Sequence, residues 1–451
     1  MMPKVSVVTV NYNGERFLKG LLESIAKQTY SAFETIVVDN ASTDTSVVEL
    51  QRRFPSVRIV TSGTNLGFAG GNNLGAQQAR GDLIAFINND AVVDEYWLER
   101  LVNRYVRLET QDHRVGAIAP KVRLFRRFVE ITVTVPTSYS ADHDNRALGI
   151  AVDIQNTGIM GADYDKKLFR AGFYKEECGF DGRIVRWSKG NCSFSLPIPD
   201  PPPANPAQPA MLRLTVSGGS ATDKRVAEIY CGTTRLSTIA VNKSFTTHEI
   251  SLAPGMLNQA TWLINNAGTH LNFRNGATAD RGIFEQDMGQ YDFSSPVDAF
   301  CGCSFLMNRA LFLRFGGFDE SFFMYFEDTD LSWRLTKAGY RIFFEPTSVV
   351  HHIHAGSSIE WSPSFRYHVT RNQQLMKIKN IPSLILPATL LLLVVKWLFY
   401  GVSLVRSDGL PRDLSLSQLT PDQISFKALG TALRMASAML AKRAHNPPVN
   451  A

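Results

Sequence analysis

The chain has 451 residues, with 47 Lys and Arg against 41 Asp and Glu and a formal net charge of +6. This length is enough for two hydrophobic cores and a tail. Its five cysteines are scattered, which fits a reducing compartment and argues against a disulfide-linked secreted scaffold. The chain enters an apolar, β-branched run almost at once, so we expect no signal peptide.

The first 80 residues alternate between strand and helix patterns. A β-branched run at residues 5–10 leads into the polar turn 11–14 and then into a stretch with apolar residues on one helical face. A second apolar strand ends in Asp39, and Ser, Thr and Asp residues that can cap a helix follow it. Residues 57–60 predict a third strand, and the Asn/Gly-rich stretch 65–73 leads into another helix. Strands and helices that alternate with short links predict a mostly parallel α/β sheet with helices on both faces.

The apolar run 83–87 is followed by Asn88, Asn89 and Asp90. A buried parallel strand that carries an acid to its C-terminal edge has this pattern, and open α/β sheets bind their ligands at that edge. An acid beside two amides can hold a divalent cation against a diphosphate. The plainer alternative is a strand followed by an Asn/Asp turn.

Four segments in this order resemble family 2 glycosyltransferases of the GT-A fold, closest to their bacterial rhamnosyltransferase-like members: VSVVTVNYNG, VVDNASTD, NLGFAGGNN and FINND. The resemblance covers residues 4 to about 123 and resumes from about 264 to 380. It implies a GT-A, Rossmann-like sheet and transfer of a sugar from a nucleotide-sugar donor to a glycan or lipid-linked acceptor in cell-surface polysaccharide synthesis. No nucleic acid is expected as a partner.

The resemblance also implies the donor contacts. Asn11 and Asp39 match the positions that bind the nucleotide base, and the Asp39 carboxylate could accept the imide N–H of uracil or thymine. The loop that carries Asn65, Gly67 and Asn73 would lie under the ribose and diphosphate, where glycine permits a close backbone approach. The leading donor is dTDP-L-rhamnose, and UDP-sugars come next.

The family's Asp-x-Asp-like element is Asn88-Asn89-Asp90 in this chain, so only its last position is an acid. We assign the metal contact to Asp90 and expect Asn88 and Asn89 to contact the sugar or the ribose. One carboxylate makes a weak site until the diphosphate supplies more oxygens. The cation, Mn²⁺ or Mg²⁺, and the donor should therefore bind together.

Three histidines lie at residues 351–354, after a strand pattern. On a strand, His352 and His354 share one face and His351 lies on the other. The family often has a metal-contacting histidine here, and we favour His352, with His354 second. A structural role for all three is the alternative.

Three acids, Glu327, Asp328 and Asp330, begin a predicted helix directly after the aromatic run 322–326. Capping is a simple explanation for acids at a helix N-terminus, but it does not explain the aromatic run. The resemblance implies that the second acid, Asp328, is the catalytic base, and desolvation by aromatic surface would raise its pKa as a base requires. Glu327 and Asp330 are expected to be structural or acceptor-binding acids, and Glu327 and Trp333 are our candidate substrate contacts in this helix.

The family pattern is interrupted at residues 124–263, where short alternating segments are separated by Gly, Pro and Asn turns. These segments predict an antiparallel β-sandwich inserted into the catalytic domain. Aromatic residues such as Trp187 and Tyr174 would suit glycan binding, and a spacer or interaction module is the alternative. The expected domains are the nucleotide-sugar-binding half 1–123, the insertion 124–263, the acceptor and catalytic half 264–380 and the tail 381–451.

The tail is basic and apolar. From Phe365 onward, 11 Lys and Arg stand against 3 Asp and Glu, a net charge of +8, and they flank the apolar run 384–405. This run is about as long as a membrane span, but Pro387 and Lys396 favour an interfacial or kinked segment, and a core helix stays open. Residues 421–444 predict a second, basic amphipathic helix. Together they predict docking at the anionic cytoplasmic face of the membrane.

The sequence thus predicts an inverting, metal-dependent glycosyltransferase at the cytoplasmic face of the cell membrane. A sugar nucleotidyltransferase shares the α/β layout, but it would be expected to use early basic residues for a triphosphate, and the turn 11–15 has none. The alternative outside enzymes is a glycan-binding protein that acts through the insertion. Hydrolysis of a nucleotide sugar without acceptor would argue against that alternative.

Overall fold

The structure is a computed structural model, and it describes residues 2–139, 146–162, 167–178, 183–199, 210–219, 225–354, 362–406 and 415–444. The chain forms two compact units. Unit 1 comprises residues 1–124 and 264–451, and unit 2 comprises residues 125–263. Unit 2 begins one residue after the start of the expected insertion.

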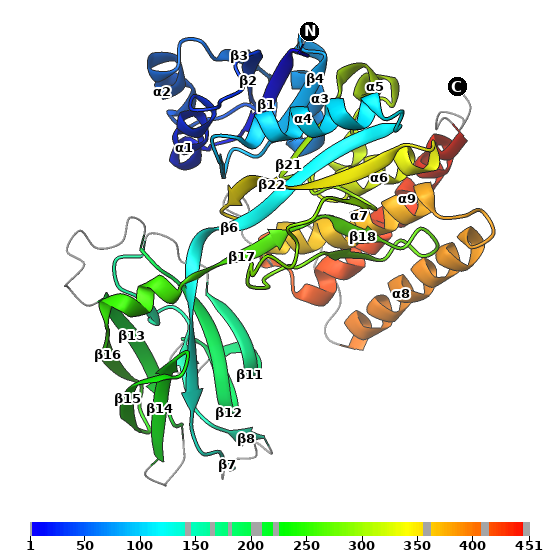
Figure 1. Ribbon diagram of the computed structural model, residues 1–451. Coiled ribbons are helices and arrows are strands. Elements are labelled where there is room, and N and C mark those ends of the chain that lie inside the picture. The colour runs from blue at the N-terminus through cyan, green and yellow to red at the C-terminus, as the bar shows by residue number, and fades with distance from the viewer. Residues whose placement is uncertain are drawn as a thin grey trace. The chain divides into compact units, whose positions relative to one another are not determined.

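The N-terminal part of unit 1 is a parallel sheet (Figure 1). Its strands lie in the order β3–β2–β1–β4, and Asn11 at the end of β1 is level with Asp39 at the end of β2. Helices follow the first three strands, as the alternating pattern predicts. The bounds are β1 Val5–Asn11, α1 Glu15–Ile25, β2 Phe33–Asp39, α2 Ser46–Arg53, β3 Arg58–Thr61, α3 Gly67–Gln78 and β4 Leu83–Ile87.

Beyond β4 the sheet is mixed. Strand β21 lies antiparallel between β4 and β6, β22 runs parallel to β6, and β5 and β20 pair antiparallel with β22. The prediction of an α/β fold is therefore confirmed. All pairs of the N-terminal part are parallel, whereas beyond β4 parallel pairing of β22 with β6 is mixed with antiparallel pairs. The bounds are β5 Ala91–Val93, α4 Trp97–Thr110, β6 Val115–Thr134, β20 Ser295–Val297, β21 Ser304–Asn308, α5 Arg309–Arg314, η2 Glu320–Phe322, α6 Glu327–Lys337 and β22 Arg341–His352.

Helices cover both faces of this sheet. On one face, β1 and β4 pack on α1 and α4 through a cluster that includes Val7, Leu21 and Leu101. On the other face, the same strands pack on α3, α5 and α6 through a cluster that includes Val8 and Leu331. Because both faces are buried, the strands are apolar throughout, as in β4, where all five residues are buried.

One of the Ser/Thr/Asp residues after β2 bonds the start of the next helix. Helix α2 begins at Ser46, and Asp44 Oδ1 accepts from Ser46 N at 3.2 Å, although Thr45 itself makes no side-chain cap. Ser42 and Asp44 also accept hydrogen bonds from Asn13 N and Glu15 N at the turn after β1, at 3.1 and 2.9 Å. These side chains therefore fix the β1 turn, because unpaired N–H groups there attract nearby oxygens.

Unit 2 is an antiparallel β structure with its own core. Strand β13 pairs with β9, β10 and β16, and β12 pairs with β6, β9 and β11. Inward-facing residues such as Ile131, Phe194 and Leu214 form the core. The bounds are β7 Ser138–Tyr139, β8 Ala147–Leu148, β9 Ala151–Asp153, β10 Gly158–Ile159, β11 Leu168–Cys178, β12 Ile184–Pro197, β13 Ala210–Ser217, β14 Arg225–Cys231, β15 Thr234–Val241, β16 Thr246–Leu252, η1 Pro254–Gln259 and β17 Thr261–Asn266.

The C-terminal helices belong to unit 1. They are α7 Pro363–Asn380, α8 Leu386–Arg406 and α9 Pro421–Ala444, after the small hairpin β18 Thr269–Leu271 and β19 Thr278–Asp280; η3 Leu416–Gln418 precedes α9. One hydrophobic cluster joins Phe322 and Trp333 to Leu375, Leu393 and Met439. Parts of α8 and α9 thus belong to the core of unit 1. A truncation after Asn380 would expose this core.

The close contact of α3 with the sheet gives a stability prediction. A Cβ at Gly75 would lie 2.4 Å from Val8 Cγ1 and 2.9 Å from Val38 Cγ2. We expect Gly75→Val to lower the free energy of unfolding by about 1–3 kcal/mol, because a packed interface cannot absorb the added methyl groups. Chemical denaturation measures the change. The control is Gly63→Val, since a Cβ at Gly63 meets no atom within 4 Å; equal losses in both variants would contradict the prediction.

Candidate functional site

The C-terminal edge of the parallel strands brings the predicted base-binding residues together. Asn11 is fully buried, and its amide donates to Ser42 Oγ and Ser46 Oγ at 3.1 and 2.8 Å. Asp39 Oδ1 accepts from Ser42 N at 3.1 Å, and Asn89 Nδ2 donates to Asn11 Oδ1 at 3.3 Å. These side chains form one hydrogen-bonded group at the edge, so their positions are fixed before any ligand binds.

The loop at the start of α3 is equally ordered. Asn65 Oδ1 accepts from Gly67 N at 2.9 Å and from Asn40 Nδ2 at 3.0 Å. Gly67 has a φ of +70°, and a Cβ there would lie 2.4 Å from the carbonyl oxygen of Phe323. Only glycine fits, because of both the backbone angle and the neighbouring carbonyl. This loop therefore contacts the aromatic segment that precedes Asp328.

The predicted metal residues Asp90 and His352 lie next to each other. Asp90 is 3% exposed, and its Oδ1 lies 3.2 Å from His352 Nε2. His352 Nδ1 lies 2.7 Å from Asn265 Oδ1. Since an amide oxygen only accepts, Nδ1 is the donor to Asn265, and Nε2 is the ring nitrogen that faces Asp90. Asn88 Nδ2, 3.4 Å from Nε2, is on the same side.

These donors fit a divalent cation. A buried carboxylate and an imidazole nitrogen that face each other are ligand types that a divalent cation takes, and the partner of Nδ1 orients the ring as in many metal sites. Among the residues that the structure describes, no group of three or more His, Cys, Asp or Glu side chains has metal-site geometry. The protein thus offers two ligands here, which fits a cation that also needs ligand oxygens. His351 points elsewhere, with Nε2 3.1 Å from Asp94 Oδ1.

Asp328 is partly exposed at the start of α6. Its Oδ2 accepts from Gly302 N at 2.7 Å, and its Oδ1 accepts from Thr329 N at 2.6 Å. Burial raises the pKa of Asp328 above its usual range, although these two N–H groups oppose the shift and the nearby Asp280 adds to it. The pKa shift has the direction expected for a base.

Glu327 has a different environment. It is 4% exposed, and its Oε2 has no hydrogen-bond partner among the described residues. Burial first, and then the charge of Asp328, raises the pKa of Glu327 well above its usual range. This shift favours the protonated form of Glu327, in which the side chain donates a hydrogen bond but cannot take up a proton.

The backbone segment Gly302–Cys303 contacts both Asp328 and the turn Asn88–Asp90. Gly302 N donates to Asp328, and the carbonyl of the next residue, Cys303, accepts from Asn88 N at 2.9 Å. Asp328 and the Asn88–Asp90 turn are thus held by adjacent residues of one segment.

Two candidate substrate contacts have other partners. The Asn73 side chain bonds Phe318 O and Glu320 Oε1 at 2.8 and 3.0 Å. Trp333 is 1% exposed and packs edge-on against Phe273. Their roles as substrate contacts stay predictions, and in this structure both side chains serve the packing of unit 1.

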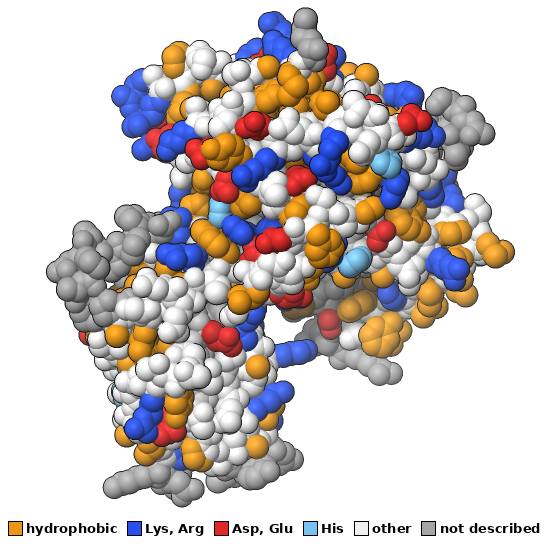
Figure 2. All heavy atoms as spheres, in the orientation of Figure 1, with side chains coloured by type: hydrophobic (Ala, Val, Ile, Leu, Met, Phe, Trp, Pro, Cys, Tyr) orange, Lys and Arg blue, Asp and Glu red, His pale blue; other side chains and the backbone are white. Residues whose placement is uncertain are grey.

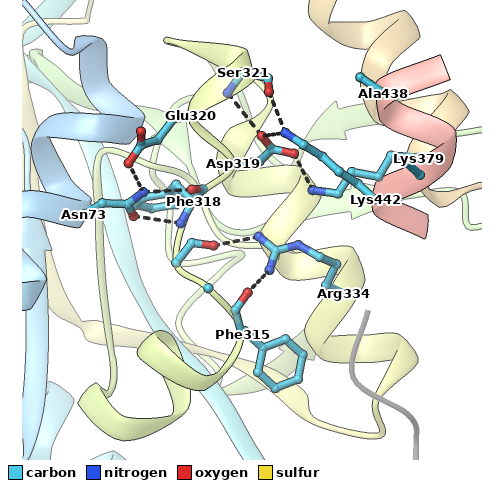
Figure 3. A pocket seen from close by; sticks show the side chains of 13 residues that line it. Asn73, Phe315, Phe318, Asp319, Glu320, Ser321, Arg334, Lys379, Ala438 and Lys442 are labelled. Carbon is cyan, nitrogen blue, oxygen red and sulfur yellow. Dashed lines mark hydrogen bonds and ion pairs between the residues drawn. The ribbon is translucent and has the colours of Figure 1, made fainter. Parts of the chain in front are cut away.

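A cavity of about 640 Å³ lies beside Asn73, between the loop 315–321 and helices α7 and α9 (Figure 3). Ion pairs form its wall: Lys379 Nζ lies 2.8 Å from Asp319 Oδ2 and 2.9 Å from Asp330 Oδ2. Burial alone would raise the pKa of Asp330, but the charges of Arg334 and Lys379 outweigh it and hold the pKa below its usual range. Asp330 is therefore a structural acid.

Sequence reasoning missed the residues that orient the site. Asn265 fixes His352, Gly302 fixes Asp328, and Arg371 and Asn372 of α7 bind the loop before Asp328. No local sequence pattern marks Arg371 and Asn372, because only the structure shows that these two polar side chains are buried. Buried polar side chains in a helix indicate specific partners.

Parts of the chain are similar in sequence to known glycosyltransferases. Residues 6–137 match the model of glycosyl transferase family 2, and residues 283–355 match a model described as the N-terminal domain of galactosyltransferase. An uncharacterized glycosyltransferase of Haemophilus influenzae is 38% identical over 86 residues, 19% of this chain and 29% of the relative. Rhamnosyltransferase WbbL of Escherichia coli is 36% identical over 93 residues, 20% of this chain and 35% of the relative.

A third relative also has a solved structure. Poly(ribitol-phosphate) beta-N-acetylglucosaminyltransferase TarS of Staphylococcus aureus is 34% identical over 103 residues, 22% of this chain and 18% of the relative. The structure of its residues 1–349 with UDP-GlcNAc aligns with a TM-score of 0.23 at 29% identity, over 26% of this chain and 34% of that chain. The chain spans about a third of the length of the first curated relatives that it matches.

Residues 6–137 are thus similar to glycosyl transferase family 2. They include the parallel part of the α/β sheet.

Proposed function

We propose that this protein is an inverting, metal-dependent glycosyltransferase that uses a nucleotide-sugar donor. The observation that carries the proposal is the segment Gly302–Cys303, which holds the candidate base Asp328 through one residue and the Asn88–Asp90 turn through the next. The family match of residues 6–137 supports the same class of reaction.

In the proposed reaction, Asp328 Oδ takes the proton of an acceptor hydroxyl. The hydroxyl oxygen forms a bond to the anomeric carbon from the side opposite the diphosphate, the bond from that carbon to the diphosphate breaks, and the nucleoside diphosphate leaves. Asp90 and His352 would hold a divalent cation, which offsets the charge that develops on the leaving diphosphate. Asn11 and Asp39 orient the nucleotide, and protonated Glu327 can donate a hydrogen bond to a substrate oxygen.

The leading donor is dTDP-L-rhamnose, because one relative is a rhamnosyltransferase and the sequence resembles that group. UDP-sugars are next, since TarS was solved with UDP-GlcNAc. The acceptor would be a glycan or a lipid-linked glycan in polysaccharide synthesis. A thermal-shift screen of nucleotide sugars with Mn²⁺ or Mg²⁺ tests the class, and stabilisation by none of them, with no release of nucleoside diphosphate, would refute it.

The metal assignment makes the first functional prediction. Asp90→Asn should abolish turnover and the increase in nucleotide affinity that Mn²⁺ causes, because His352 alone is a weak ligand. Calorimetric titration of UDP and dTDP, with and without Mn²⁺, measures this effect independently of activity. His354→Asn serves as the neighbouring control and should keep most of the metal effect. Full activity of the wild type in EDTA would contradict the assignment.

The assignment of Asp328 as the base makes the second functional prediction. Asp328→Asn should lower kcat at least ~10²-fold while donor affinity is kept, the scale of general-base catalysis. Since the base must be ionised and its pKa is raised, wild-type kcat/KM should fall as the pH is lowered through a pKa above the usual value of about 3.9. Glu327→Gln is the matched control, because protonated Glu327 and Gln are both donors. A larger loss of kcat in Glu327→Gln would mean that Glu327 is the base.

We further propose that α8 lies on the cytoplasmic face of the membrane. Among the described residues, α8 contains the one helix segment, Leu386–Val405, that is long and apolar enough to cross a membrane, and only 11% of it is buried. Its exposed residues include Leu391, Leu392, Leu398 and Phe399. Figure 2 shows hydrophobic side chains at the surface over α8. Trp397 stacks on Phe426 of α9, and Leu393 is buried in the cluster of the C-terminal helices, so one side of α8 packs on protein. A helix with one packed and one exposed apolar side suits an interfacial position.

Point variants test this proposal, since truncation would expose the core. Phe399 is 70% exposed, and Phe399→Glu should weaken binding to phosphatidylcholine vesicles that contain phosphatidylglycerol, because it removes apolar burial and adds repulsion. Vesicle co-sedimentation measures the loss. Val48→Glu, at a side chain 65% exposed on α2, is the control and should bind normally. Wild-type protein with no affinity for these vesicles would refute the membrane role.

A further inference from the structure

The loop directly before Asp328 has an unusual backbone. Phe323, Tyr325 and Phe326 have φ values of 65°, 70° and 71°, in the left-handed region that side chains other than glycine rarely adopt. Three such residues within four positions persist only where the surroundings enforce them. The loop leads straight into α6, which begins at Glu327.

Helix α7 provides the enforcing contacts. Asn372 is fully buried, and its Nδ2 donates to the carbonyl oxygens of Phe322, Met324 and Tyr325 at 2.9, 2.7 and 2.9 Å. One amide group thus shares two protons among three carbonyls of the loop. Arg371 adds hydrogen bonds to the carbonyls of Ser321 and Phe322 at 3.2 and 2.8 Å.

Ring contacts from the same helix complete the arrangement. The His368 ring stacks on Phe323 with centroids 5.5 Å apart, and Phe365 meets Tyr325 edge-on at 5.1 Å. At the other end of the loop, Lys379 of α7 and Lys442 of α9 bind Asp319 (Figure 3). The C-terminal helices therefore hold the loop from residue 319 to 325.

The loop also contacts the donor side. The Phe323 carbonyl accepts from Ala69 N at 3.1 Å and fills the place that a Cβ of Gly67 would take. A change in the loop backbone would therefore displace both the start of α3 and the start of α6. Asp328 is the second residue of α6, so its place opposite Gly302 N depends on this loop.

We propose that Asn372 is a positioning residue for the reaction: it clamps the left-handed loop 323–326 and thereby sets the place of Asp328. This inference rests on the proposed function, in which Asp328 is the base. Asn372 lies on a different helix from every candidate substrate contact, so it acts through the loop.

The test compares Asn372→Leu, which keeps the size and removes the donors, with Gln373→Leu, the same kind of change at the next residue of α7. Gln373 is partly exposed, and its Oε1 accepts a hydrogen bond from Gln374 Nε2 at 3.5 Å. We expect Asn372→Leu to lower kcat by about 10- to 100-fold, because a displacement of about 1 Å can cost that much. The affinity for UDP or dTDP with Mg²⁺, measured by calorimetry, should fall by a smaller factor than kcat, since Asn11 and Asp39 are held by hydrogen bonds with Ser46 and Ser42 and not by the loop 323–326. Gln373→Leu should match the wild type.

Hydrogen–deuterium exchange gives a readout that is independent of turnover. Amides of residues 319–330 should exchange faster in Asn372→Leu, while those of β1 and β2 stay as in the wild type. If Asn372→Leu does not fold, His368→Ala weakens the same clamp and should show the same pattern in milder form.

The outcomes separate the two proposals. Unchanged kcat and unchanged exchange in Asn372→Leu would overturn the clamp, and so would faster exchange throughout unit 1 with equal losses of kcat and nucleotide affinity, which marks a general loss of stability. A wild type that transfers no sugar would overturn the proposed function, and the exchange comparison would still decide whether Asn372 holds the loop.

Discussion

The site depends on one constraint, the register of strands at the C-terminal edge of the sheet. Parallel pairing sets Asn11 level with Asp39, and the antiparallel pairing of β22 with β5 sets His352 opposite Ala91, next to Asp90. Because a shift by one residue would turn each of these side chains to the other face, the hydrogen-bond ladder itself fixes the polar group. The apolar residues of the strands, buried on both faces, make such a shift very costly.

Asp328 is positioned by a loop and not by strand pairing. Asp328 is at the start of a helix, and its position comes from a backbone whose left-handed residues cost about 1–3 kcal/mol each. The buried amide of Asn372 and the guanidinium of Arg371 offset this cost with hydrogen bonds to loop carbonyls. The sheet edge is thus fixed by regular strand pairing. The loop before Asp328 is held by side chains of helix α7.

The sequence predicts the regular half well. The strand before Asp39 and the apolar run before Asp90 follow from periodicity, because each pattern is local. The partners of the site residues could not be predicted this way. Asn265 lies 87 positions from His352, and Asn372 lies 47 positions from Tyr325, so no local pattern records their contact. The left-handed loop was hidden for another reason: its aromatic residues suggest a strand or a core helix, and only tertiary contacts enforce its conformation.

The position of β21 in the sheet has a consequence for biosynthesis. This strand fills the edge of β4 by pairing Ser304 with Ile87, so the edge of β4 stays open while all of unit 2 is made. At the usual rate of about 5–20 residues/s, the ribosome needs roughly 10–40 s to proceed from Ile87 to Ser304. During that time a fully apolar strand with an unpaired edge is exposed, and such edges are prone to aggregate. All described strands of unit 2 are made before β21, so the edge of β4 is covered only after Ser304 has been made.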